Sequence, residues 1–288
     1  MSNTLEHMKR KIASAEQLES VVRTMKAQAA SSIVQYQTAV ASLVDYCHAI
    51  DLGLIACFGY TPPIAKNTQQ KPKHVTAIVF GSDQGLVGQF NEQVADYMRS
   101  KLDKISGTKT IISVGERADE CLRDIGFGID KTYEVPNIIS AITPLVGQIL
   151  TDISAYPSDD HSLIIFYNQS VLDISYKTTH QQLLPFDTLW QETLTQSTWP
   201  THNVPEIIGG KTKMTLSALI HEHLFISLFR ACAESLTCEN ASRLAAMQRA
   251  EKNIAEMLKE LKQKSRSIRQ NSIDEELFDV IASYKFGK

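Results

Sequence analysis

Gly209-Gly210-Lys211-Thr212 is the segment of this 288-residue chain that comes closest to a nucleotide-binding motif. A phosphate-binding loop ends in Gly-Lys-Thr or Gly-Lys-Ser, and it needs a second glycine five residues before the last one. The earlier position here holds Pro205, and the residues before Gly209 are too short and broken a run for the strand that such a loop follows. We therefore interpret the segment as a flexible connection into a following helix.

A second glycine pattern, Gly81, Gly85 and Gly88, lies between a predicted strand and a predicted helix. Its spacing is G-x-x-x-G-x-x-G, whereas a dinucleotide-binding loop has G-x-G-x-x-G. A tight strand-to-helix turn explains these glycines without a ligand. Asp83 lies within this segment, and we expect its carboxylate to cap the turn that follows.

The remaining reactive side chains form no recognisable constellation. His221 and His223 are two residues apart on a predicted helix, so they point to different faces and cannot form an i, i+4 metal-binding pair. We expect them to be packed or hydrogen-bonded. The five cysteines form no C-x-x-C pair, which is typical of reduced, mostly buried thiols in a cytosolic protein. The sequence predicts no catalytic residue, no cofactor-binding residue and no metal site.

Both ends of the chain are free of helix-breaking residues, because residues 1–52 and 211–286 contain neither glycine nor proline. Apolar or small residues recur there at steps of three and four, the pattern of a coiled-coil seam. The N-terminal seam comprises Leu5, Met8, Ile12, Ala15, Val22, Met25, Ala29, Ile33, Tyr36, Val40, Leu43, Cys47, Ile50 and Leu54. The C-terminal stripe comprises Leu216, Leu219, Ile220, His223, Leu224, Leu228, Ala231, Ala241, Leu244, Met247, Ile254, Leu258, Leu261, Ser265 and Ile268.

These patterns predict three parts: a coiled-coil helix over 1–57, a central domain over 73–187, and a second coiled-coil helix over 211–286. The two helices pair antiparallel if they dock on the same face of the central domain. The C-terminal helix then extends beyond its partner, and a polar helical extension is stable when other proteins surround it.

The central domain reads as α/β and Rossmann-like. Strands are predicted at 75–80, 110–114, 161–167 and 176–186, and helices at 90–102, 116–125 and 138–156. Strands that alternate with helices favour a largely parallel sheet with helices on both faces. Residues 61–73 and 188–204 are polar and turn-rich, and we expect loops there.

The charge distribution limits the class of partner. A net charge of −3 argues against a nucleic-acid-binding protein. Residues 211–288 carry 13 basic and 10 acidic groups, and the basic ones gather at Lys259, Lys262, Lys264, Arg266 and Arg269. This basic band is either a solvated helix face or a surface that meets an acidic partner. The start of the chain lacks the apolar run of a signal peptide, and no window approaches 18 apolar residues, so we expect no membrane span.

Five sequence blocks, in order along the chain, resemble the gamma subunit of F-type ATP synthases. They are Lys11-Ile12-x-Ser14 with Met25-Lys26; Ser82-Asp83-x-Gly85-Leu86-x-Gly88-x-Phe90-Asn91; Gln181-Gln182-Leu183-Leu184-Pro185; Glu239-x-x-x-Arg243-Leu244-x-Ala246-Met247 with Asn253; and Arg269-Gln270 with Ile273, Glu276 and Asp279. The resemblance spans the whole chain. It departs from the family pattern at Asp274 and at Ser283-Tyr284, which suggests a divergent, alternative sodium-translocating type.

The resemblance implies a central-stalk rotor without catalytic residues of its own. Its coiled coil would turn inside a hexamer of alpha and beta subunits. Its α/β domain would bind the epsilon subunit and the membrane rotor ring, at the cytoplasmic face of the plasma membrane. By family analogy the partner contacts would be Met25, Lys26, Glu239, Arg243, Arg269, Gln270 and Glu276. The alternative classes are an unrelated coiled-coil scaffold or adaptor and, less favoured, a nucleotide-binding enzyme.

Overall fold

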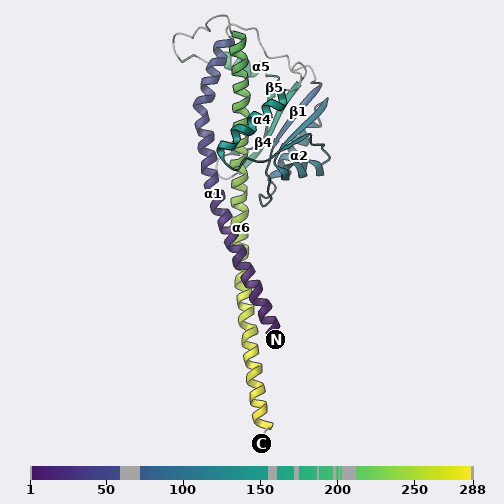
Figure 1. The fold of residues 1–288 in the computed structure, drawn as a ribbon, viewed down its shortest axis with the longest axis vertical. Coiled ribbons are helices and arrows are strands. Elements are labelled where there is room, and N and C mark those ends of the chain that lie inside the picture. The colour runs from purple at the N-terminus through teal and green to yellow at the C-terminus, as the bar shows by residue number, and fades with distance from the viewer. Residues whose placement is uncertain are drawn as a thin grey trace. The chain divides into compact units, whose positions relative to one another are not determined.

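The computed structural model describes residues 2–58, 72–154, 161–171, 175–186, 188–196, 199–200, 202 and 212–286 (Figure 1). The chain divides into two compact units. The central unit spans residues 31–242, and the two-helix unit combines residues 1–30 with residues 243–288. Helices α1 (Ser2–Phe58) and α6 (Thr212–Phe286) each contribute to both units, so the inner parts of both long helices belong with the α/β domain.

A five-stranded sheet forms the middle of the central unit. Its strands are β1 (His74–Phe80), β2 (Thr108–Val114), β3 (Lys131–Tyr133), β4 (His161–Val171) and β5 (Ser175–Leu184), in the order β3-β2-β1-β4-β5. The pairings among β1 to β4 are parallel, and β5 joins β4 antiparallel at the edge. The expected largely parallel sheet is confirmed, whereas β3 was not expected because three residues carry too little periodicity to register as a strand.

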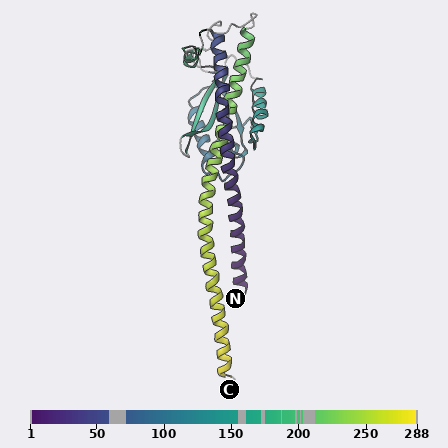
Figure 2. The ribbon, with the colours of Figure 1, turned by 90° about the vertical axis from the view of Figure 1, so that its left-hand side faces the viewer.

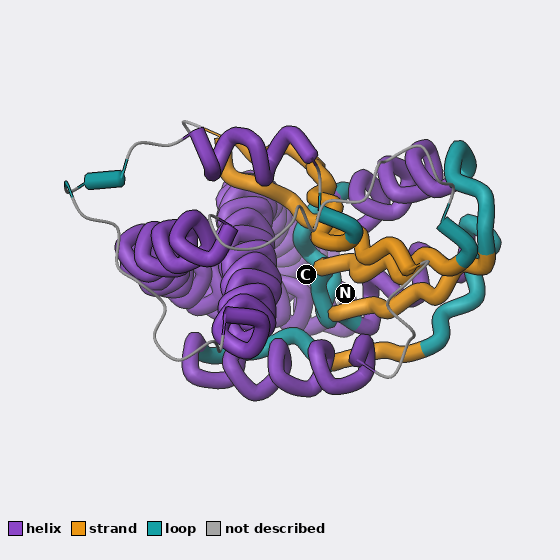
Figure 3. The backbone as a smooth tube through the Cα atoms, turned by 90° about the horizontal axis from the view of Figure 1, so that it is seen from above, coloured by secondary structure: helices purple, strands orange, loops and turns teal. Residues whose placement is uncertain are grey.

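Helices cover both faces of this sheet (Figure 3). On one face, α2 (Phe90–Leu102) and α3 (Glu116–Asp124) bury Val94, Met98 and Leu122 against strand residues such as Val79 and Phe166. On the other face lie α4 (Ile142–Ser154), preceded by the short 3-10 helix η1 (Ile139–Ala141), and the inner part of α6. The sequence alternation therefore predicted the layers correctly.

The inner part of α6 is enclosed on every side. All ten residues from Ala231 to Asn240 are buried, polar ones included. A helix normally keeps one face in solvent, and burial all round marks a helix that runs through a core. In the central unit this stretch packs with strand residues Ile78 and Leu163, and with Tyr36 of α1.

One local expectation is wrong. The stretch 188–204 contains helix α5 (Thr188–Gln196), whose Trp190 packs with Phe58 and so draws an otherwise polar segment into a helix. Gly53 lies inside α1, which continues through it to Phe58. A Cβ at Gly53 would lie 3.0 Å from a Leu219 methyl carbon, so the missing side chain allows α1 and α6 to pack closely within the central unit. The predicted loop at 61–73 lies outside the described residues except at its end.

The predicted N-terminal seam is confirmed, because every one of its fourteen residues is buried or half-buried.

By length and composition, both long helices could also cross a membrane. The stretch Leu5–Phe58 contains a window of mean hydropathy 1.5, of which 22% is buried, and Thr212–Phe278 contains one of mean hydropathy 1.2, of which 33% is buried. This measure averages hydropathy over a window, so it does not contradict the prediction that no window approaches 18 apolar residues. Core helices of soluble proteins pass the same test, so it does not assign a membrane span.

Candidate functional site

The two-helix unit carries most of the residues that the sequence marks as partner contacts. Its two segments run antiparallel, as Figure 2 shows. Two ion pairs fix this direction: Lys26 Nζ lies 2.5 Å from Glu251 Oε2, and Lys262 Nζ lies 2.8 Å from Glu16 Oε1. Residue numbers fall along α1 as they rise along α6, which confirms the antiparallel pairing in this unit.

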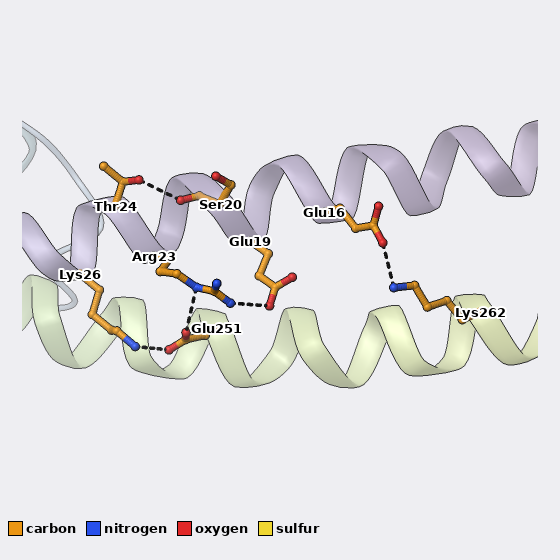
Figure 4. Close-up of polar contacts among 8 residues, drawn as sticks. All are labelled: Glu16, Glu19, Ser20, Arg23, Thr24, Lys26, Glu251 and Lys262. Atoms are coloured by element: carbon orange, nitrogen blue, oxygen red, sulfur yellow. Dashed lines mark hydrogen bonds and ion pairs between the residues drawn. The ribbon is translucent and has the colours of Figure 1, made fainter.

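A charged stripe on α1 forms these links (Figure 4). Glu16, Glu19, Arg23 and Lys26 are separated by steps of three and four residues, so they share one face of the helix. Arg23 Nη2 donates a hydrogen bond to Glu19 at 3.2 Å, and its Nε lies 3.9 Å from Glu251. The hydrogen bond from Lys26, together with the two positive charges, lowers the pKa of the Glu251 carboxyl.

A second stripe on α1 is apolar and reaches solvent. Leu18, Val21 and Met25 also follow steps of three and four. Leu18 and Val21 are 57% and 55% exposed, and Met25 is half-buried. Isolated exposed apolar residues are ordinary, but a periodic row of them along a helix is typical of an interaction surface.

The C-terminal end of α6 was expected to be a polar extension, but it exposes a larger apolar surface. It comprises Ile273, Leu277, Phe278, Val280 and Ile281, which are between 46% and 69% exposed. We call these five residues the apolar tip. Figures 1 and 2 both show that α6 continues past the start of α1 in this unit, so α1 does not cover the tip. Water solvates such a surface poorly, and a surrounding partner would remove it from water.

Six of the seven predicted contact residues lie in the two-helix unit. Arg269, Gln270 and Glu276 are exposed, Met25 and Arg243 are half-buried, and the Lys26 amine is held by Glu251. Glu239 belongs to the buried stretch of α6 in the central unit, where only 5% of its surface is exposed. The basic band is exposed, and it contributes Lys262 to the link with Glu16.

Sequence reasoning missed Glu251. The C-terminal stripe steps from Met247 to Ile254, and the omitted position between them is Glu251. A charged residue at a seam position needs a charged partner, and Lys26 of the N-terminal seam region is the residue that meets it. This gap in the stripe was the available signal.

The glycine segment after β1 proves to be a structural junction. A Cβ at Gly81 would lie 2.3 Å from the Ala118 side chain, so α3 approaches the loop too closely for any other residue. Asn91 and Ser82 exchange hydrogen bonds of 2.9 and 2.8 Å, which close the turn. This confirms the interpretation as a tight strand-to-helix turn.

Asp83 acts differently from the expected cap. Its carboxylate accepts hydrogen bonds from the backbone N–H of Glu116 at 3.0 Å and of Val135 at 2.9 Å. It therefore caps the start of α3 and holds the segment after β3, and the expectation that it caps its own turn is wrong. The carboxyl ends of parallel strands meet at one edge of a sheet, which brings these distant residues together.

The histidines and the nucleotide-like motif do not form a site. His223 packs against Trp190, with ring centroids 4.9 Å apart, and burial lowers its pKa. Among the described residues no group of three or more His, Cys, Asp or Glu side chains could hold a metal ion. Of the motif ending in Lys211-Thr212, only Thr212 is described, as the first residue of α6.

Comparison with known proteins agrees with this geometry. The sequence profile described as "ATP synthase" matches residues 4–285. An ATP synthase gamma chain of Glaesserella parasuis is 28% identical and covers 94% of this chain and 95% of its own length. One from Haemophilus influenzae is 25% identical, with 96% of each chain covered.

Solved structures share the fold. The rotor of the Euglena gracilis mitochondrial ATP synthase in rotational state 1 has a TM-score of 0.65 at 16% identity, with 95% of this chain and 100% of that chain covered. The central stalk and c-ring structure of the Tetrahymena thermophila enzyme gives a TM-score of 0.54 at 21% identity, with 80% and 99% covered. A match over nearly the whole chain does not support the unrelated scaffold or adaptor. The chain belongs to the ATP synthase gamma family, the central-stalk subunits of F-type ATP synthases.

Proposed function

We propose that this chain is the non-catalytic rotor of its ATP synthase complex. It couples ion flow through a membrane ring to ATP synthesis or hydrolysis in a hexamer of alpha and beta subunits. The structure of the Euglena gracilis enzyme with F1 and the c-ring, to which this chain is similar with a TM-score of 0.66, supports these partners. Proton transport and the alternative of sodium transport both stay predictions.

The apolar tip is the observation that carries this proposal. Five large apolar side chains at the end of α6 would favour aggregation if they stayed in water. A ring of surrounding subunits removes them from water and still permits rotation, because apolar contacts have no fixed direction.

The two stripes of α1 make one side of this helix charged and another side apolar. The charged stripe is linked to α6, and the row Leu18, Val21 and Met25 stays open. An asymmetric surface is what a shaft needs in order to push the surrounding subunits in turn. We propose that six residues of the two-helix unit make the changing contacts with the surrounding subunits: Met25, Lys26, Arg243, Arg269, Gln270 and Glu276. Glu239, the seventh predicted contact residue, would act from its buried position in the central unit. We also propose that the basic band binds acidic loops of the surrounding subunits.

The central unit then provides the attachment to the epsilon subunit and the ring. We propose a peripheral position at the cytoplasmic face of the plasma membrane. The exposed polar residues Lys177 and Gln182 of the edge strand β5 are part of the surface that we propose for this attachment.

Co-expression with the alpha and beta subunits tests the proposal. The full chain is expected to co-purify with both, and the reconstituted complex to make ATP when an ion gradient is applied. Deletion of residues after Arg266 removes the apolar tip and is expected to lower coupled ATP synthesis by at least tenfold. Far-UV circular dichroism of the isolated variant should lose only the helical signal of the deleted residues.

A milder pair of variants separates surface chemistry from helix length. Leu277→Ser with Ile281→Ser should weaken coupling, whereas Gln263→Ser, at an exposed polar position of the same helix, should not. A chain that fails to bind either subunit and stays monomeric and fully helical would overturn the proposal.

A further inference from the structure

A small cavity in the central unit lies among α1, β5, α5 and α6. Its volume is about 150 Å³. The residues that matter for its chemistry are Asp51, Gln181, Trp190, His223, Ser227 and Arg230. All of them belong to one compact unit, and none is among the expected rotor contacts.

The charges around the cavity leave one carboxylate uncompensated. Arg230 Nε donates a hydrogen bond to Glu234 Oε1 at 2.7 Å, so these two charges neutralise each other. Asp51 is half-buried, and no hydrogen bond or ion pair joins its carboxylate to another residue in the described ranges. Burial raises the pKa of the Asp51 carboxyl, which His48 only partly opposes. A carboxylate that loses solvation without gaining a partner is stabilised either by protonation or by a bound cation.

The neighbouring histidine does not supply that cation. Burial lowers the pKa of His223, so its ring is neutral near pH 7. Cys47, also at the cavity wall, feels opposite effects beyond its own burial: Arg230 lowers and Asp51 raises its pKa. Both charged groups therefore lie close enough to Cys47 to affect its thiol.

An aromatic wall completes the site. Trp190 stacks on Phe186 with ring centroids 4.9 Å apart, and His223 lies at the same centroid distance from Trp190. Trp190 also lines the cavity, so its ring carbons offer an apolar surface against which the carbon atoms of a ligand can pack. The stacking holds the indole in place before a ligand arrives, which reduces the entropy lost on binding.

Hydrogen-bonding groups also line the cavity. The side-chain oxygens of Gln181 and Ser227 can accept hydrogen bonds from an ammonium group. The Nη groups of Arg230 have no hydrogen-bond partner among the described residues, so they can donate to an oxygen atom of the ligand. The volume is too small for a nucleotide, whose pockets start at roughly 300 Å³.

We propose that this cavity binds a small organic ammonium ion, with its nitrogen at Asp51, its carbon atoms against Trp190 and an oxygen toward Arg230. The ammonium group itself could come from a free amine or from a lysine side chain of a partner subunit. Neither source is needed for the rotor role, so the two proposals can fail separately.

Ligand-observed NMR on the full-length chain tests the proposal, with ethanolammonium as the probe. Ethylene glycol has similar size and no charge, and it serves as the control ligand. Saturable binding of ethanolammonium alone is expected. Asp51→Asn should weaken that binding at least tenfold, because it removes the charge and keeps the shape.

Asp45→Asn is the matched control variant, since Asp45 is exposed on the same helix outside the cavity. It should bind the probe as the unmodified chain does. Absence of saturable binding, or equal binding by the Asp51→Asn variant with an unchanged circular dichroism spectrum, would overturn the proposal. Asp51→Glu, which restores the charge, should recover part of the affinity.

The assembled ATP synthase complex distinguishes the two sources of the ammonium group. If the natural ligand is a free amine, the complex binds ethanolammonium as the isolated chain does. If a lysine of a partner fills the cavity, assembly abolishes binding of the probe. In that case a carbodiimide should cross-link Asp51 to the partner, and Asp51→Asn should prevent the cross-link.

Discussion

Asp83 joins three segments of the central unit through one carboxylate group. Its two oxygens accept backbone hydrogen bonds from the start of α3 and from Val135. Replacing Asp83 by Ala should lower the free energy of unfolding by about 1 to 2 kcal/mol, because both donors lose their partner. Urea denaturation measures the change. Asp96→Ala, on the exposed face of α2, should change stability far less, and equal effects of the two substitutions would contradict the prediction.

Glu251 gives the two-helix unit a pH-dependent link. Its partners lower the pKa of its carboxyl in the folded state. The link therefore stabilises the folded protein at pH values above the pKa that a glutamate has in the unfolded chain. This stabilisation is lost as the pH falls through the lower pKa that Glu251 has in the folded state. Thermal unfolding of Glu251→Gln should begin at a lower temperature than that of the unmodified chain at pH 7, and the difference should shrink below about pH 4. A difference that stays constant down to pH 3 would argue against the link.

At the scale of elements, α1 and α6 pack closely in the central unit because Gly53 has no side chain. Gly53→Leu should force the helices apart and destabilise the protein by about 1 to 3 kcal/mol, since a Cβ there already lies 3.0 Å from Leu219. Adding Leu219→Ala makes room and should recover part of the loss, although Leu219→Ala alone is destabilising. Chemical denaturation of the four proteins measures the coupling. Strictly additive effects would mean that the two residues do not meet.

The same helices show what the sequence could and could not predict. The seam from Leu5 to Leu54 was readable because burial against a partner helix repeats every three or four residues. Gly53 has a poor helix propensity, and the packing that outweighs this cost involves Leu219, a residue far along the chain. Helix α5 was missed because its packing depends on two side chains, Trp190 and Leu194, in an otherwise polar segment. The role of Asp83 was missed because its partners follow it by 33 and 52 residues.

At the scale of the whole molecule, the two units should differ in local stability. The central unit contains the sheet and its two apolar clusters, whereas the two-helix unit buries a single seam. Hydrogen exchange by mass spectrometry should find the amides of residues 231–240 among the slowest and those of residues 267–286 among the fastest. Binding of the alpha and beta subunits should slow exchange mainly in the latter range. Uniform protection along α6 would contradict this expectation.

The link between Lys26 and Glu251 spans 225 residues of sequence. During synthesis the N-terminal segment leaves the ribosome long before its partner exists. At about 5 to 20 residues per second, the delay is roughly 10 to 45 s. Throughout that time Met8, Ile12, Val22 and the rest of the seam are open to incorrect partners. The first segment to be synthesised is thus among the last to pack against its partner helix. A nascent chain of this kind depends on chaperones or on prompt assembly.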